Sequence, residues 1–228
     1  MDAQTVLSRR TLVQLGAVLG AAAAAVALTS CSSARTPPAS PTPQPREDPT
    51  TPSSSGRVLL AYFSRPGENY YRGGRRNLQV GNTEVLARMI DGLIDCDLYR
   101  IEAADPYSDD YDATVARNVD EQDGDARPAI ANPLESISQY DTVLVGSPIW
   151  NVRPPMIMTT FLEGHDFTGK TVHPFVTYTV SGLGRTEAVY SPALVGARLQ
   201  PGLAVQGEEV AEHRDDVEAW LRDAGFTA

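Results

Sequence analysis

One short run of residues limits the possible folds of this chain more than any other. Residues 142–145 read TVLV, and Gly146, Ser147 and Pro148 follow directly. A continuous, β-branched apolar run of this length predicts a strand that is covered on both faces, as in a parallel sheet. The turn after it carries Trp150. Open α/β sheets bind ligands at the carboxyl ends of their strands. Trp150 therefore either offers a flat surface to a planar heteroaromatic ligand or closes the top of the core.

Strands and helices alternate along the chain after residue 57. Strands are also predicted at residues 58–63, 97–102, 171–179 and 203–206. Helical spacing of apolar residues predicts helices at residues 83–93, 111–118, 155–162 and 208–224, with a short turn at 131–139 and a partly helical segment at 185–199. Such alternation predicts an α/β fold with a parallel, doubly wound sheet.

The first 56 residues are predicted to precede the folded domain. Arg9 and Arg10 stand before an uncharged, Ala-rich stretch that ends in LTSC at Cys31, so residues 1–30 are predicted to be a lipoprotein signal peptide. The paired arginines favour twin-arginine export, with a Sec-type lipoprotein signal or a membrane helix as alternatives. Cys31 would then carry lipid. Residues 31–56, rich in Pro, Ser and Thr, would be a spacer between the outer face of the cell membrane and one domain at 57–228.

Charge and cysteine content exclude several classes of function. The net charge of −10 disfavours nucleic acid as a partner and suits a basic partner protein or simple solubility. Cys96 is the only cysteine besides Cys31, so neither a disulfide framework nor a zinc motif is possible. The acidic residues 105–125 lack the spacing and the final Glu of a calcium loop. We therefore expect no metal site, and the three scattered histidines indicate no catalytic residue.

Three strand ends should meet at one edge of the predicted sheet. The first strand ends at Ser64, and after an insertion the segment GNTE, from Gly81, begins the next helix. The free amides and the dipole of a helix N-terminus favour a phosphate, although Asn82 or Thr83 could instead be an ordinary N-cap. The third strand ends in SPIWN, and the fourth ends in the small, flexible run TVSGLG, which is rich in backbone donors.

The segments YFSRPGEN and VGNTE, then YDTVLVGSPIWN, then TYTVSGLGRTE resemble the flavodoxin family, in particular its flavodoxin-like bacterial branch with a split phosphate loop. The resemblance covers residues 57–205. It implies a flavodoxin-like, doubly wound, five-stranded parallel sheet in the order 2-1-3-4-5, with FMN between strands one and three. It implies phosphate contacts from Ser64, Asn82, Thr83 and the backbones of Arg65 and Gly81. It implies ring contacts from Pro148, Ile149, Trp150 and Asn151 on one side and from Thr179, Ser181, Gly182 and Gly184 on the other.

The function that the resemblance implies is electron transfer by FMN to redox partner proteins or small acceptors. Neutral groups at the phosphate and an acidic surface would favour a low reduction potential. The alternative is an FMN-dependent reductase of quinones or other small acceptors, with residues 68–79 as a lid. A binding lipoprotein without flavin is a third possibility. The loop after the fourth strand lacks the Tyr that often covers the ring in this family, and Tyr70, Tyr71 or Tyr178 could replace it.

Overall fold

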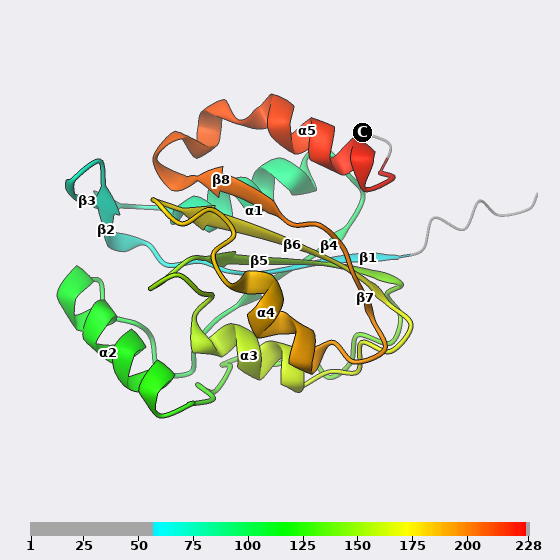
Figure 1. Ribbon diagram of the computed structural model, residues 1–228, viewed down its shortest axis with the longest axis horizontal. Coiled ribbons are helices and arrows are strands. Elements are labelled where there is room, and N and C mark those ends of the chain that lie inside the picture. Colours follow the sequence, from blue (N-terminus) through cyan, green and yellow to red (C-terminus); the bar gives the residue numbers. More distant parts are fainter. Residues whose placement is uncertain (1–56, 227–228) are drawn as a thin grey trace, which may run out of the picture. The chain divides into compact units, whose positions relative to one another are not determined.

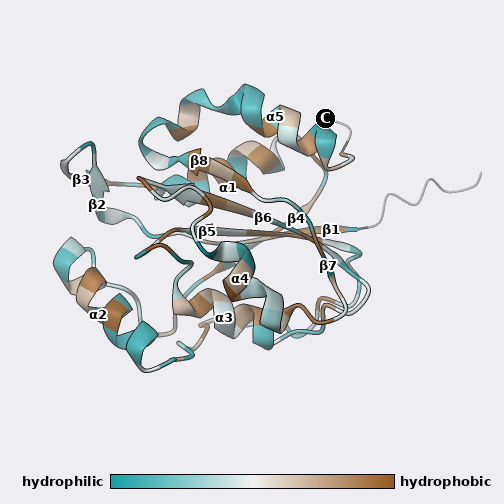
Figure 2. Cartoon of the chain, in the orientation of Figure 1, coloured by the Kyte–Doolittle hydropathy of each residue, from teal (hydrophilic) through white to brown (hydrophobic). Residues whose placement is uncertain are grey.

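The computed structural model describes residues 57–226. The predicted signal peptide, the spacer and Cys31 lie outside these residues. A central, mainly parallel sheet carries helices on both faces (Figure 1). Figure 2 shows hydrophobic residues concentrated on the central strands and on the helix sides that face them. No helix within residues 57–226 combines the length and the apolar character needed to cross a bilayer.

The strand order agrees with the prediction from the sequence. Strand β1 (Val58–Phe63) lies between β4 (Asp97–Ile101) and β5 (Thr142–Pro148), and all pairings are parallel. Strand β6 (Thr171–Tyr178) pairs with β5, and β8 (Leu203–Gln206) pairs with β6. For the five predicted strands this is the order 2-1-3-4-5. The predicted flavodoxin-like doubly wound fold is therefore confirmed.

The fifth position in the sheet is occupied by two short segments. Strand β7 (Arg198–Leu199) pairs with the first residues of β6, whereas β8 pairs with β6 from Phe175 onward. Pro201 lies between the two segments. Because proline has no N–H to donate to a neighbouring strand, it interrupts the edge of the sheet there.

Helices on each face enclose one half of the core. On one face lie α1 (Asn82–Asp91) and α5 (Arg214–Asp223), which contribute Leu86, Ile90 and Leu221 to a buried cluster. On the other face lie α3 (Met156–Glu163) and α4 (Thr186–Tyr190), which contribute Phe161 and Tyr190 (Figure 1).

One helical prediction was wrong in detail. The segment predicted as one helix at 208–224 is a 3₁₀ helix, η2 (Gly207–Glu212), followed by α5. A second 3₁₀ helix, η1 (Ser191–Ala193), follows α4. The short turn predicted within residues 131–139 lies at Ser138 and Gln139, where the N–H of Tyr140 donates 3.1 Å to the carbonyl oxygen of Ile137.

The insertion after β1 is an antiparallel hairpin of β2 (Gly67–Tyr71) and β3 (Gly74–Leu78), where the sequence had predicted no strands. Arg72 and Gly73 form its turn, and both have positive φ, at 45° and 86°. A two-residue hairpin turn of type I′ requires this conformation at both positions. Gly73 suits such a turn, but Arg72 is not a residue type that favours positive φ, so the sequence carried no strong hairpin signal here.

Helix α2 (Tyr111–Asp123) is longer than predicted. The carboxylate of Asp110 begins it by accepting a hydrogen bond of 2.8 Å from the backbone N–H of Ala113. Such an N-cap satisfies one of the helix's free amides. The helix ends at Asp123, where the N–H of the C-cap residue Gly124 donates to the carbonyl oxygen of Asp120.

Candidate functional site

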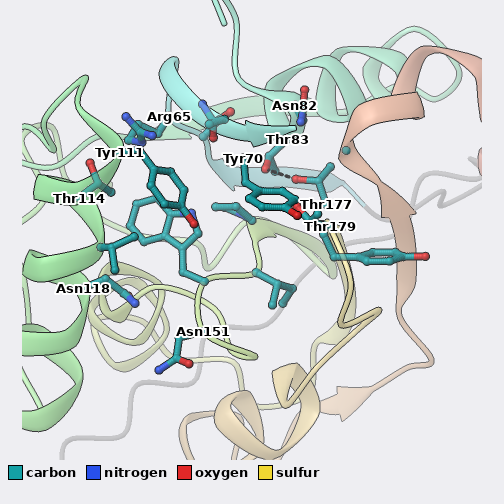
Figure 3. Close-up of a pocket in the computed structure, with 18 of the residues that line it drawn as sticks. Arg65, Tyr70, Asn82, Thr83, Tyr111, Thr114, Asn118, Asn151, Thr177 and Thr179 are labelled. Carbon is teal, nitrogen blue, oxygen red and sulfur yellow. Dashed lines mark hydrogen bonds between the residues drawn. The ribbon is translucent and has the colours of Figure 1, made fainter. Parts of the chain in front are cut away.

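A cavity of about 410 Å³ lies at the carboxyl ends of β1, β5 and β6, between α2 and the hairpin. This volume lies in the range of about 300–1,000 Å³ that is usual for small-molecule sites. Figure 3 shows side chains that line it. Most of the predicted cofactor residues are among them: Ser64, Arg65, Asn82, Thr83, Pro148, Ile149, Trp150, Asn151 and Thr179.

The end of β1 and the start of α1 touch, although an insertion separates them in the sequence. The backbone N–H of Glu84 donates a hydrogen bond of 3.1 Å to Oγ of Ser64. Gly81 does not line the cavity, but a Cβ at this position would lie 2.5 Å from the carbonyl oxygen of Arg65. A glycine is needed for this close approach. The split loop therefore still brings Ser64 to the first turn of α1.

Hydroxyls and free amides gather at this end of the cavity. The Oγ1 atoms of Thr83 and Thr177 are 2.7 Å apart, and both residues line the cavity. The backbone amides of Asn82 and Thr83 belong to the first turn of α1, where no intrahelical acceptor exists. The positive end of the helix dipole lies there as well. This end of the cavity therefore suits an anion.

Arg65 lines the cavity with its side chain, whereas the sequence had suggested only a backbone role. The side chain is 8% exposed, and its guanidinium donates to the carbonyl oxygens of Ser108, at 2.7 Å, and of Glu68. Its buried Nε has no hydrogen-bond partner within residues 57–226. Burial lowers the pKa of Arg65, but an arginine remains charged at neutral pH. A buried cation thus borders the cavity, on the side of Tyr111 and Thr114 (Figure 3).

Trp150 is held by a tight turn. Its N–H donates to the carbonyl oxygen of Arg153 at 2.8 Å, and the N–H of Arg153 donates back at 3.3 Å. Asn151 and Val152, between them, have φ of 49° and 60°. This is the geometry of a type I′ turn. The turn determines where the indole ring points.

Trp150 packs in the core and also lines the cavity. The indole packs edge-on against Phe63, with ring centroids 5.6 Å apart, and against Tyr107, at 5.2 Å. It also lines the cavity together with Pro148 and Ile149. Trp150 is therefore anchored in the core and presents part of its ring to the cavity.

The loop after β6 contributes only its first part to the cavity. Thr179 lines it, whereas Ser181, Gly182 and Gly184 do not. The loop instead supports the Trp150 turn, because the N–H of Arg185 donates 2.8 Å to the carbonyl oxygen of Val152. Contact of Ser181, Gly182 and Gly184 with a ligand stays a prediction.

Several lining residues were not anticipated from the sequence. Helix α2 supplies one wall, and the hairpin supplies Asn69 and Tyr70. Of the three tyrosines considered as a ring cover, Tyr70 and Tyr178 line the cavity and Tyr71 does not. The remaining unanticipated residues are Tyr111, Thr114, Val115, Asn118, Val119, Thr177 and Gly207. The spacing of Tyr111, Val115 and Val119 by four residues was the available signal for the α2 wall.

Known proteins of similar sequence and structure agree with this description. A family model described as flavodoxin matches residues 77–224. A Bacteroides uniformis protein assigned as a flavoprotein is 30% identical, over 73% of this chain and 98% of its own, with a TM-score of 0.57. The corresponding Bacteroides eggerthii protein is also 30% identical, over 73% of this chain and 96% of its own, with a TM-score of 0.58.

A more distant structure shares the fold. A Lactobacillus acidophilus flavoprotein solved in complex with FMN is 20% identical, over 69% of this chain and 98% of its own, with a TM-score of 0.50. No curated protein sequence matches significantly.

Proposed function

Since this chain belongs to the flavodoxin family, we propose that it binds FMN in the cavity and transfers electrons. The family and the fold support a flavin cofactor. The observation that carries the proposal is that the ends of β1 and β5, between which the strand order reverses, border one cavity together with the start of α1. Ligands of open α/β sheets bind at such a reversal.

The residues at the α1 end fit the phosphate of FMN. Ser64, Asn82 and Thr83 supply hydroxyls, an amide side chain and the first amides of α1. An anion at a helix N-terminus gains about 0.3–2 kcal/mol from the dipole. Arg65 lines the cavity as well and adds a positive charge near it. This buried cation opposes the low reduction potential that we expect from the acidic surface.

The residues at the β5 end fit a flat ring system. Pro148, Ile149 and Trp150 present apolar surface, and Thr179 borders the same cavity. An aromatic contact contributes about 0.5–1.5 kcal/mol beyond burial. Bound FMN would supply the redox chemistry, and the protein would supply its position and electrostatic environment.

Purification with bound flavin tests the proposal. The full chain should be yellow, and the released flavin should be FMN. The double variant Ser64→Ala/Thr83→Ala removes two hydroxyls, each contributing about 1.5–3 kcal/mol to a charged ligand. We expect its FMN dissociation constant to rise at least about a hundredfold. Ser136→Ala, at an exposed position outside the cavity, is the control. A colourless chain that takes up no FMN at micromolar concentration would refute the proposal.

We also propose that the domain is tethered to the outer face of the cell membrane. The signal-like residues 1–30, the spacer at 31–56 and the lipid-accepting Cys31 support this. Twin-arginine export carries folded proteins, so FMN could be loaded before export. Cys31→Ala should release the chain from the membrane fraction, and replacing Arg9 and Arg10 with Lys should retain the precursor inside the cell. Unchanged fractionation of both variants would contradict the tether.

A further inference from the structure

A buried carboxylate lies behind Trp150, outside the cavity. Glu121 of α2 is buried and is not among the residues that line the cavity. Its Oε1 accepts a hydrogen bond of 2.7 Å from Nε of Arg117, and its Oε2 accepts one of 2.8 Å from the hydroxyl of Tyr107. A buried carboxylate is costly unless its oxygens are satisfied, and here both are. The aromatic residue that this carboxylate holds is Tyr107.

Tyr107 is held from two further directions. The guanidinium carbon of Arg117 lies 4.0 Å from the centre of the Tyr107 ring, within the range of a cation–π contact. Nη1 of Arg117 donates to the carbonyl oxygens of Asp105 and Pro106, at 2.9 and 3.1 Å, in the loop that carries Tyr107. Burial raises the pKa of Tyr107 above its ordinary value, so the hydroxyl keeps its proton and remains a donor to Glu121. The Tyr107 ring therefore has one defined position.

This ring is the surface against which the indole of Trp150 packs. The ring centroids of Tyr107 and Trp150 are 5.2 Å apart, with an angle of 78° between the planes. Phe63, at the end of β1, packs edge-on against both rings, at 5.4 and 5.6 Å. The turn at Asn151 and Val152 fixes the backbone of Trp150, but a side chain on a fixed backbone still has several staggered rotamers. The two neighbouring rings select among them.

The same arrangement of side chains occurs at the opposite edge of the sheet. The hydroxyl of Tyr140 donates 2.8 Å to the carboxylate of Asp97, which pairs with Arg57 at 2.7 Å, and the guanidinium of Arg57 lies 5.3 Å from the Tyr140 ring. These residues stand at the amino ends of β5, β4 and β1, away from the cavity. The Asp97 side chain is 51% exposed, against 10% for Glu121. Hydrogen bonds to a charged group are stronger away from water, so the arrangement on α2 is the firmer one.

We propose that Tyr107 and Glu121 are positioning residues for the cofactor ring. The Glu121 carboxylate fixes the Tyr107 ring, and this ring sets the angle at which Trp150 meets bound FMN. Neither residue lines the cavity, so each acts on the cofactor only through Trp150. Because an aromatic contact depends on the relative orientation of its rings, a shift of the indole weakens FMN binding although every residue of the cavity wall is retained. The inference rests on the proposed function, since it assigns Trp150 to the ring end of the FMN site.

Motion of the indole tests the first step. Tyr107→Phe removes the hydroxyl and keeps the ring, and Tyr140→Phe is the matched control, because it removes the equivalent hydroxyl far from the cavity. Both variants are made in the full chain carrying Trp220→Phe, in which Trp150 is the only tryptophan. Time-resolved fluorescence anisotropy of the FMN-free protein measures indole motion on the nanosecond timescale. We expect Tyr107→Phe to add a fast depolarising component that the parent and the control lack.

FMN binding tests the second step. We expect the FMN dissociation constant to rise about three- to tenfold in Tyr107→Phe, together with a changed visible circular dichroism spectrum of the bound flavin. Neither should change in Tyr140→Phe. Glu121→Ala removes the same hydrogen bond and should reproduce both effects. Glu121→Gln keeps an oxygen that accepts from Tyr107, so it should restore most of the affinity and most of the spectrum.

The outcomes separate this inference from the proposed function. An indole that is as rigid in Tyr107→Phe as in the parent overturns the inference, and so does an equal change in Tyr140→Phe. A mobile indole with unchanged FMN affinity and spectrum also overturns it, because Tyr107 would then stabilise only the core. Should Tyr107→Phe not fold, the difference between Glu121→Ala and Glu121→Gln decides in the same way. A parent chain that takes up no FMN refutes the proposed function instead, and the anisotropy measurement then decides by itself whether Tyr107 fixes Trp150.

Discussion

Val152 is a β-branched residue in a left-handed conformation, in the turn that holds Trp150. Its φ is 60°, a region that residues with a branched Cβ rarely occupy. The neighbouring Asn151, with φ of 49°, is a residue type that tolerates this region. Replacing Val152 with Asn should therefore relieve strain and preserve the turn.

The size of the effect follows from two opposing contributions. The left-handed conformation costs an ordinary residue about 1–2 kcal/mol, most of which Asn avoids. Val152 is 49% exposed, so the substitution forfeits only about 0.5 kcal/mol of apolar burial. The net gain in the free energy of unfolding is about 1 kcal/mol. For a domain of this size, that gain raises Tm by about 2–4 °C.

Thermal unfolding of the FMN-free chain, followed by circular dichroism, measures this gain. FMN affinity should change less than about threefold, because the hydrogen bonds between Trp150 and Arg153 are retained. Val195→Asn is the control, since Val195 is exposed and its φ is not positive. If Val152→Asn leaves Tm unchanged or lowers it, or if Val195→Asn raises Tm equally, the turn stores no strain and the reasoning is wrong.

Two further predictions follow from buried positions. Gly81→Ala would place a Cβ 2.5 Å from the backbone oxygen of Arg65. We therefore expect the variant to lose FMN binding and to lose about 1–3 kcal/mol in the free energy of unfolding, measured by urea titration. An alanine variant that binds FMN normally would contradict the close approach. Burial lowers the pKa of His173 below its ordinary 6.5. The unfolded chain therefore takes up a proton at His173 more readily than the folded chain, and the free energy of unfolding falls as pH drops below about 6.5. His173→Leu should flatten this part of the pH dependence in urea titrations between about pH 7.5 and 5.5, whereas an unchanged slope would show that His173 is not responsible.

Local patterns in the chain were sufficient to predict the sheet. TVLV at 142–145 and VLLAYF at 58–63 predict strands from their own residues, and both are buried central strands. Hydrophobic periodicity and strand burial are properties of a few adjacent residues, so the pattern and the outcome coincide. The edge of the sheet was predicted less well, because Pro201 divides the fifth strand.

The candidate site was predictable where it follows directly from a strand. Ser64, Thr83 and Trp150 were expected at the cavity because they stand at strand or helix ends. The hairpin and the α2 wall were not expected. Their positions depend on contacts such as that of Arg65 with Ser108, 43 residues away, and that of Arg72 with Glu208, 136 residues away.

The sequence alone was enough to predict the alternating α/β architecture and the three turns at strand ends, since each depends on short-range sterics and on apolar burial of single elements. The strand order was expected only from the resemblance to the flavodoxin family. The cavity wall formed by α2, the buried charge of Arg65 and the role of the hairpin depended on the folded chain. These features arise where distant segments meet and exclude water, and no pattern of neighbouring residues encodes which segments will meet.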